Sequence, residues 1–215
     1  MSKTTLREVF DEIASSWYNF RHWTRFRREL EALAKRWGGG KLLNIGCGHG
    51  ADFLPFKGGF ELYGIDFSTE MLKLALKYAQ KFSFSANLFL SEASHLPFAD
   101  ESFDWAISIA TYHHLSDARA RKRAFLELER VLKPEGEAFI TVWNRWHPRF
   151  WFKDKEILLP WKTKNKTLYR YHYLFSYFEL KKLLEEAGFE VVNFPFGSSQ
   201  RLFSRNILLL ARKKR

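Results

Sequence analysis

The sequence predicts an α/β fold in which helices cover a parallel β-sheet. From about residue 38 to residue 143, short apolar runs typical of buried strands alternate with segments whose apolar residues recur at helical spacing. The run 103–109 is apolar on both faces, as expected for a central strand of a parallel sheet. Strands that alternate with helices form parallel sheets joined by right-handed crossovers. A chain of 215 residues is expected to fold as one such domain, 1–215.

The spacing of apolar residues, and the residues that begin and end helices, define the first two parts of this domain. Residues 1–37 are expected to be N-terminal helices, because apolar side chains recur there at helical spacing until three glycines end the region. Residues 38–143 are expected to form the core of the domain. Its strands and helices are expected, in chain order, at 42–45, 60–65, 68–82, 88–90, 103–109, 116–132 and 138–143. Ser68 caps the first of these helices, and the Lys-Pro-Glu-Gly sequence at 133–136 stops the second.

The pattern changes after residue 143. Residues 144–178 show no clean period, and an irregular stretch of this length in a compact domain is usually functional. We therefore expect an insertion on the substrate side. The last part, 179–215, holds a helix and two strands, at 189–194 and 206–211. Ser176 and Glu179 form a capping box at the start of that helix.

Charge is unevenly distributed along the chain. The formal net charge is +11, and residues 145–215 alone hold 16 Lys and Arg against 6 Asp and Glu. A basic excess of this kind favours a polyanionic partner, with nucleic acid first and an anionic membrane surface second. The alternative is a solvated surface typical of thermophilic proteins, which the scarcity of Met and Gln also fits.

Other features exclude several classes of protein. The single cysteine, Cys47, excludes a disulfide framework and a cysteine-based zinc site. The N-terminal segment is charged and amphipathic, unlike a signal peptide. The apolar runs are far shorter than the ~20 residues that a membrane span needs. We expect a cytoplasmic protein that does not act in a membrane.

A glycine-rich turn follows the first strand. It reads Asn44-Ile-Gly46-Cys-Gly48-His-Gly50, and Asp66 ends the next strand 20 residues after Gly46. Glycines at this place let the backbone approach a ligand closely, and a carboxylate at the end of the second strand accepts hydrogen bonds from ribose hydroxyls. The turn indicates that the core, 38–143, binds an adenosine-containing cofactor. By itself the turn does not exclude NAD as that cofactor.

Segments after the glycine turn indicate which cofactor this is. The glycine turn, Asp66, the sequence SEASHLPFADESFDWAISIATYHHL and the sequence VLKPEGEAFITVW resemble class I S-adenosylmethionine-dependent methyltransferases over about residues 41–143. The resemblance implies a Rossmann-like, seven-stranded, mostly parallel sheet with the last strand antiparallel and helices on both faces. It also implies S-adenosyl-L-methionine as cofactor. The implied cofactor-binding residues are Asn44, Gly46, Gly48, Gly50, Asp66, Phe67, Met71, Glu92, Ala93 and Ile109.

The resemblance assigns these residues distinct roles. Gly46 and Gly48 border the methionine end, and Asp66 binds the ribose. Phe67 and Met71 flank the adenine. Glu92 with Ala93 meets the amino edge of the adenine, and Ile109 lines the methyl donor.

Two positions depart from the pattern of that family. Asn44 stands where Asp or Glu is usual, and Glu92 stands where Asp is commoner. An amide at position 44 still hydrogen-bonds the ammonium group of the donor but loses the ion pair.

A closer resemblance extends over nearly the whole chain. VFDEIASSWYNFRHW, FDWAISIATYHHLSD, LPW, YRYHYLFSYFEL and SRNILLLARKK are similar to segments of the tRNA wobble-uridine methyltransferases, in the same order. Those enzymes esterify the carboxymethyl group on the first anticodon nucleotide, so the implied partner is the tRNA anticodon loop. They also work with a small zinc-binding activator protein, which would pair along the sheet edge at 88–90. The Tyr-His order of the family is exchanged here at His172 and Tyr173.

Methylation of a carboxylate needs no general base from the protein, because the acceptor is already ionised at neutral pH. The acceptor oxygen must be held in line with the methyl carbon, which suits the planar fork of an arginine. Arg21 and Arg170 are the candidates, with a surface role as the alternative. Of the adjacent His113 and His114, an extended segment would let only one face the substrate, and we favour His114, with Tyr112 nearby. A packed histidine is the alternative.

Two further expectations concern metal and RNA. The seven histidines are scattered without ligand spacing, so no metal site is expected. Alternating Lys162, Lys164 and Lys166 would contact phosphates, while Tyr171, with Trp161 and Tyr169, would stack on bases. Rival functions are a quinone- or sterol-type small-molecule methyltransferase, a non-catalytic methyltransferase-like subunit and an NAD enzyme.

Overall fold

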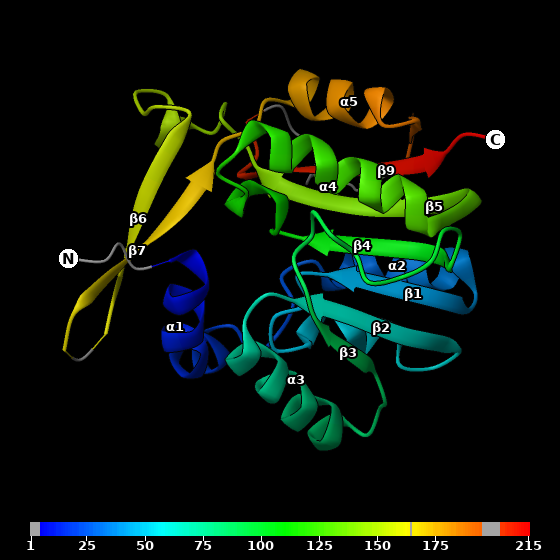
Figure 1. Ribbon diagram of the computed structural model, residues 1–215, viewed down its shortest axis with the longest axis horizontal. Helices are drawn as coiled ribbons and strands as arrows, with labels where there is room; N and C mark the ends of the chain where they lie inside the picture. Colours follow the sequence, from blue (N-terminus) through cyan, green and yellow to red (C-terminus); the bar gives the residue numbers. More distant parts are fainter. Residues whose placement is uncertain (1–4, 164, 195–202) are drawn as a thin grey trace.

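The computed structural model describes residues 5–163, 165–194 and 203–215. These residues form a seven-stranded sheet in the order β3-β2-β1-β4-β5-β9-β8, flanked by helices (Figure 1). The five strands from β3 to β5 run parallel, whereas β9 is antiparallel to both of its neighbours. The strands are β1 (Gly40–Ile45), β2 (Phe60–Asp66), β3 (Asn87–Leu90), β4 (Phe103–Ile109), β5 (Leu132–Trp143), β8 (Phe189–Val192) and β9 (Asn206–Lys213). The predicted fold class, with its antiparallel last strand, is confirmed.

Helices cover both faces of this sheet. They are α1 (Leu6–Phe20), α2 (Arg27–Trp37), α3 (Thr69–Phe82), α4 (Ala118–Val131) and α5 (Tyr177–Glu186). On one face, the apolar sides of α4 and α5 pack on the sheet around Phe125, Leu128 and Leu180. On the other, α2 and the short 3₁₀ helix η1 (Ala51–Phe56) pack around Leu33 and Phe53. No helix in the described part of the chain is long and apolar enough to cross a membrane.

The helix starts follow local capping chemistry. Ser68 accepts a hydrogen bond from the Met71 N–H, and Ser176 accepts one from the Glu179 N–H, as the sequence predicts. Each bond satisfies a backbone donor that the first helical turn leaves free. Helix α4 begins two residues later than expected, because Asp117 rather than Ser116 caps it.

Two predictions about the chain path are wrong. The Lys-Pro-Glu-Gly sequence does not separate α4 from a strand at 138, because β5 begins at Leu132 and runs through it. A register shift opposite Phe103 and a positive φ at Glu135 accommodate this path. The segment 144–178 is also not irregular throughout. It contains an antiparallel hairpin of β6 (Glu156–Lys162) and β7 (Thr167–Tyr173).

This hairpin and helix α1 together cover one end of the sheet (Figure 1). Leu168 of β7 packs with Phe10 and Ile13 of α1 in a small apolar cluster that also includes Met71 of α3. The Trp161 indole donates a hydrogen bond of 3.0 Å to the Ser16 hydroxyl. Segments from the N-terminal and substrate-side parts of the chain therefore form one cover over the carboxyl ends of the strands.

Candidate active site

A cavity of about 510 Å³ lies between this cover and the carboxyl ends of β1, β2 and β4. In the strand order of the sheet, the chain leaves β1 towards β2 on one side, whereas β4 lies on the other side. A crevice forms at such a switch point, and open α/β sheets bind ligands there. The walls come from the glycine turn, Asp66 and Phe67, Ile109 to Thr111, α1 and the hairpin.

The glycine turn is shaped by close approach. A Cβ on Gly46 would clash with Thr111, and its φ of +72° suits glycine. Gly48, with φ +53°, has nothing within 4 Å of the place where a Cβ would lie, and its N–H donates to the Asp66 carboxylate at 2.8 Å. Gly50, with φ +88°, leads into the 3₁₀ helix η1. The turn thus presents bare backbone to the cavity.

Asp66 lies at the end of β2 and is almost fully buried. Its two carboxylate oxygens accept hydrogen bonds from the N–H groups of Gly48 and Ser68. Burial raises the pKa of Asp66 to about 6. Phe67 and Met71 line the same cavity, so an apolar surface adjoins the carboxylate. This combination fits a ribose beside an adenine ring.

Asn44 is the polar residue that the sequence singled out below the glycine turn. Its side chain is fully buried, and neither its amide nitrogen nor its amide oxygen has a hydrogen-bond partner in the described chain. Leaving such atoms unpaired costs about 1–3 kcal/mol. A polar ligand group bound at the end of β1, or a water beneath it, would satisfy them. The donor set therefore fits the cofactor that the sequence implies.

Glu92 and Ala93 lie outside the lining of this cavity. Glu92 is exposed, whereas Ala93 packs in the core near Ile65. Their segment is tied to the site by the Ser91 N–H, which donates to the Asp66 carbonyl at 3.1 Å. The contact of this segment with the adenine edge stays a prediction, while Ile109 lines the cavity as expected.

Two arginines, Arg21 and Arg170, line the cavity from the side of the cover. The guanidinium of Arg170 lies 4.7 Å from the Trp161 ring centroid and 5.5 Å from that of Trp17. Arg21, at the end of α1, lies over Trp17 and Phe20. The Nε atom of each is buried without a partner among the described residues. Burial lowers the pKa of each guanidinium to about 10.

A third arginine could not be found from the sequence. Arg205 lines the cavity, stacks on Trp143 at 4.9 Å and also has a buried Nε without a partner in the described chain. Its distance in sequence from the other site residues left no local signal. Arg170 is buried, Arg21 and Arg205 are half-buried, and the Asp52 carboxylate acts on Arg21. Cations gathered in a partly buried site are costly unless anions compensate them. The three guanidinium groups are therefore suited to bind an anion such as a carboxylate or phosphate.

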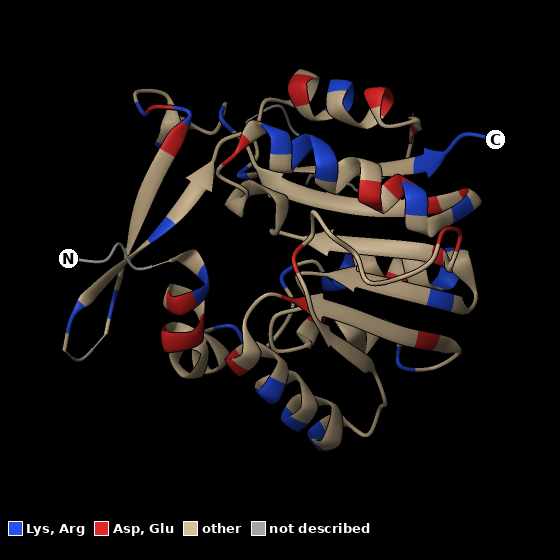
Figure 2. Ribbon diagram, in the orientation of Figure 1, with Lys and Arg blue, Asp and Glu red and all other residues tan. Residues whose placement is uncertain are grey.

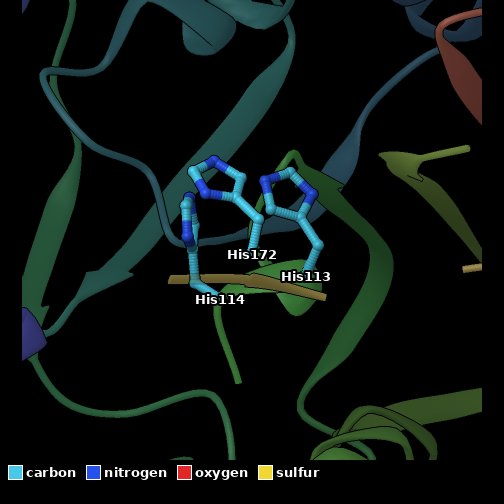
Figure 3. Close-up of side chains that lie close together, drawn as sticks. All are labelled: His113, His114 and His172. Atoms are coloured by element: carbon cyan, nitrogen blue, oxygen red, sulfur yellow. The ribbon is translucent and has the colours of Figure 1, made fainter. Parts of the chain in front are cut away.

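Three histidines also meet at the cavity, which corrects two predictions. His113 and His114 lie in the 3₁₀ helix η2 (Tyr112–His114), where an extended segment was expected, and both line the cavity. His172 of β7 joins them (Figure 3). Their scatter in sequence gave no sign of this, because strand β7 returns over η2 only in the folded chain. Burial lowers the pKa of His114 to about 4 and that of His172 to about 2.

Tyr112 does not line the cavity. Its side chain is fully buried in the core, with its ring 4.7 Å from that of Phe125, and burial raises the pKa of its hydroxyl. The turn of η2 directs neighbouring side chains to different sides, so Tyr112 packs inward while His113 and His114 line the cavity. Tyr112 is therefore next to the histidines in sequence, as expected, but its side chain packs in the core and not in the cavity.

Asp52 and His49 are further cavity residues that were not predicted. His49 lies within the glycine turn and Asp52 just after it, and their position was the only sign of them in the sequence. Burial raises the pKa of Asp52 to about 6, against the opposing effects of the Thr24 hydroxyl and the Arg21 cation. Burial likewise lowers the pKa of His49 to about 4.

The predicted RNA-binding residues of the hairpin are only partly available. Lys164 lies outside the described residues. Lys162 is exposed, but Lys166 pairs with Glu12 of α1 at 2.7 Å. Tyr171 is half-buried against the core, with its hydroxyl directed at the Ser116 carbonyl, which does not suit stacking on a base.

The basic excess of residues 145–215 does not form one patch. Figure 2 shows Lys and Arg near the tip of the hairpin and others at the far end of β9, on opposite sides of the molecule. Those on β9 pair with acidic side chains: Arg212 with Glu137, and Lys213 with Glu129 at 3.1 Å.

Comparison with known proteins agrees with this geometry. A family model described as a methyltransferase domain matches residues 43–140. The chain is similar to the tRNA (carboxymethyluridine(34)-5-O)-methyltransferase of Arabidopsis thaliana, with 34% identity over 66% of this chain and 33% of that protein. It thus spans about a third of the length of that relative.

Other relatives match over most of their length. A protein of Encephalitozoon cuniculi that is named as a methyltransferase is 30% identical over 80% of both chains. The tRNA (carboxymethyluridine(34)-5-O)-methyltransferase of Schizosaccharomyces pombe is 26% identical over 85% of this chain and 87% of that protein. The crystal structure of a SAM-dependent methyltransferase from Methanosarcina mazei superposes with a TM-score of 0.68 and 27% identity, over 82% of this chain and 93% of that one.

Proposed function

The chain belongs to the class I S-adenosylmethionine-dependent methyltransferases, and from this premise we propose that it methylates tRNA at the carboxymethyl group of a wobble uridine. The observation that carries the proposal is a pair of arginines, the half-buried Arg21 and the buried Arg170, stacked on aromatic rings in the cavity that the glycine turn lines. The relatives named as carboxymethyluridine methyltransferases support the same acceptor.

S-adenosylmethionine supplies, when bound, a methyl group on a positively charged sulfur. In this chain, Asp66 would accept hydrogen bonds from the ribose, while Phe67 and Met71 would contact the adenine. The bare backbone at Gly46 and Gly48 leaves room for the methionine part, and the unpaired amide of Asn44 would bind its polar end. These residues bind and orient the donor, and they need not take part in proton transfer.

The arginines explain how an acceptor carboxylate would be held. A guanidinium fixes a carboxylate through two parallel hydrogen bonds, which a stacked and preorganised side chain does with little loss of entropy. Trp17 and Trp161 hold Arg170 in place and exclude water from one side of it. The acceptor oxygen would then lie in line with the methyl group, where orientation alone accounts for much of the rate.

The buried histidines support an acceptor that needs no deprotonation. A general base works best with a pKa near the working pH. Burial holds the pKa of His114 at about 4 and that of His113 well below its ordinary value, which makes both weak bases. The proposal therefore gives His114 a role in binding and none as a general base. A carboxylate is already ionised at neutral pH and suits such a site.

The mouth of the cavity has the chemistry of a surface for single-stranded RNA. Phe20 and Trp23 are 64% and 58% exposed at the rim, next to the exposed Arg25 and Arg149. Exposed rings stack on unpaired bases, and arginines contact phosphates. This favours an anticodon loop over a quinone or sterol, since those acceptors would gain nothing from buried cations.

A protein partner is also part of the proposal. Strand β3 is the edge of the sheet, and its Phe89 and Leu90 are 37% and 51% exposed. An exposed apolar edge strand offers unpaired backbone groups to a partner strand. This supports the pairing with a small zinc-binding activator that the sequence resemblance implies.

One experiment tests the acceptor directly. The protein is incubated with a methyl-labelled donor and total tRNA at several salt concentrations, and the labelled nucleoside is identified after digestion. We expect a methyl ester of carboxymethyluridine, with activity that falls as salt rises because phosphate contacts are screened. Label on a nucleobase or ribose would exclude the carboxylate acceptor. Label only in small molecules added as acceptors, independent of salt, would exclude tRNA.

A further inference from the structure

His113, His114 and His172 form a compact cluster of possible metal ligands. Their rings come from η2 and β7, and Figure 3 shows the His172 ring lying between the other two. The ring centroids are 4.4 Å apart for His113 and His114, 4.5 Å for His114 and His172, and 5.1 Å for His113 and His172. One ligand nitrogen from each ring lies within 4.8 Å of the others.

Hydrogen bonds fix the orientation of two of these rings. The Nδ1 atom of His114 lies 2.8 Å from the Tyr171 carbonyl oxygen, and that of His172 lies 3.0 Å from the Arg170 carbonyl oxygen. A carbonyl only accepts, so Nδ1 carries the proton and Nε2 has a free lone pair. Metal-binding histidines are held in this way, with the second nitrogen donating to a backbone carbonyl.

The third ring and the surroundings complete the case. His113 is buried, and its Nδ1 has no hydrogen-bond partner in the described chain. Position 172 shares a face of β7 with Arg170, which the strand directs towards the cavity. The exchange of Tyr and His seen in the sequence is therefore what brings an imidazole to this face.

We propose that His113, His114 and His172 bind one divalent transition-metal ion of the zinc class, with an open coordination position facing the cavity. Three imidazoles and one open position form a common zinc-binding set, and tetrahedral ligand atoms at about 2.0–2.1 Å from the metal lie about 3.4 Å apart. The ligand atoms, now up to 4.8 Å apart, would have to move closer together when the metal binds.

The type of ligand atom sets the selectivity of this site. The three ligands are neutral imidazoles, and the cations of Arg170 and Arg205, which act on His172, disfavour every divalent ion alike. A hard ion such as Mg²⁺ needs oxygen ligands and is excluded, whereas Zn²⁺, Co²⁺ and Ni²⁺ bind imidazole well. The proposal does not depend on the identity of the methyl acceptor.

Cobalt provides the test, since Co²⁺ in a tetrahedral nitrogen site has a visible absorption band. Untagged protein is titrated with Co²⁺ and then with Zn²⁺ as competitor. We expect one ion per chain, displacement by Zn²⁺ and no displacement by Mg²⁺. His172→Asn and His113→Asn should each weaken Co²⁺ binding more than about 100-fold, beyond the loss typical of an outer-shell change. The exposed His95 serves as the control, and His95→Gln should bind as the wild type does.

The experiment remains decisive if a buried variant fails to fold. Thermal unfolding and circular dichroism report folding without depending on the cavity that the cluster lines. X-ray absorption of the zinc-loaded wild type should show three imidazole ligands without any variant. Absence of a cobalt band in the wild type, fewer than three imidazoles at the zinc, or undiminished binding by folded His172→Asn would overturn the proposal.

Discussion

At the scale of single residues, the site is made of polar groups that the fold buries without satisfying them. Asn44 has two unpaired amide atoms, and Arg21 and Arg170 each keep a buried Nε without a partner in the described chain. Such groups lower the stability of the free protein, and a bound ligand that pairs with them would recover this loss. We therefore propose these residues as the ones that matter most for binding.

Asp66 tests this view of the donor site. Asp66→Ala should weaken S-adenosylhomocysteine binding about 10- to 100-fold for each ribose hydrogen bond removed, since a bond to a charged group contributes about 1.5–3 kcal/mol. Calorimetry measures the affinity, and Glu70→Ala, which removes an exposed carboxylate from the nearby helix α3, is the matched control. Equal affinities of the wild type and a folded Asp66→Ala would remove Asp66 from the site.

The same carboxylate predicts a pH dependence. The pKa of Asp66 is raised to about 6 in the free protein, and the ionised form is the better acceptor for ribose hydroxyls. Affinity for S-adenosylhomocysteine should therefore be constant above about pH 7 and fall as the pH is lowered through about 6. Asp66→Asn should bind more weakly and lose this dependence. A wild-type affinity that stays unchanged from about pH 7.5 to about pH 5 contradicts the assignment.

The arginines carry the prediction about chemistry. Arg170→Lys and Arg21→Lys keep the charge and lose the planar fork, so the acceptor carboxylate is less well oriented. In at least one of them the single-turnover rate should fall about 100-fold, whereas tRNA affinity, spread over many phosphates, should barely change. Arg25→Lys, at the exposed rim, is the control.

The acceptor class also predicts the pH profile of the rate. With saturating donor, the single-turnover rate should stay flat from about pH 7 to 9, because a carboxylate with a pKa near ~4 is already ionised. A rate that rises with pH through this range would indicate an acceptor that must lose a proton. Full activity of both lysine variants, together with such a rise, would eliminate the carboxylate acceptor.

At the scale of elements, features that depend on neighbouring residues in the sequence were predicted. Features that depend on contacts between distant segments were missed. The strand-helix alternation, the caps at Ser68 and Ser176 and the glycine turn are local features, and all are present in the structure. The β6–β7 hairpin was missed because its alternation is interrupted by a proline and covers only one face. Its pairing with α1 depends on contacts such as Trp161 with Ser16, which no local pattern reveals.

The hairpin carries a prediction of its own. Changing Lys162, Lys164 and Lys166 to Ala should weaken tRNA binding and flatten its salt dependence, since each lysine that binds a phosphate adds about 0.7 to the slope of log affinity against log salt. Lys166 pairs with Glu12, so its single change should alter the slope less than that of Lys162. Filter binding at several salt concentrations measures both effects. If the triple variant keeps the wild-type slope, the hairpin lysines do not contact phosphate.

At the scale of the whole molecule, the active site exists because distant parts of the chain meet. The N-terminal helix supplies Arg21, the core supplies the glycine turn and η2, and the hairpin supplies Arg170 and His172. Most of these residues could be identified one by one from the sequence, through resemblance. The convergence of three scattered histidines and the inward packing of Tyr112 could not, because both depend on how η2 turns beneath β7.

The far end of the molecule is joined in a similar way by Glu137 of β5. Its buried carboxylate accepts hydrogen bonds from Arg36 and Trp37 of α2 and from Arg212 of β9. These donors overcome the effect of burial and hold the pKa of Glu137 at about 2. The Glu137 side chain thus connects α2 with β5 and β9. We expect it to contribute to the stability of the whole domain and not to ligand binding at the cavity.

Glu137→Gln should therefore lower the free energy of unfolding by about 1.5–3 kcal/mol, discounted for the partial exposure of both arginines. Because the folded-state pKa is depressed, the stabilisation is fully present above the ordinary pKa of 4.5 and is lost as the pH falls towards about 2. The gap between the unfolding curves of wild type and variant should be constant above about pH 5 and shrink below it. Glu190→Gln, which removes an exposed partner of Arg212 at 3.6 Å, should change stability by less than about 1 kcal/mol, as is typical of surface pairs. A Glu137→Gln effect equal to that of Glu190→Gln would show that the two ends of the chain are held together by apolar packing alone.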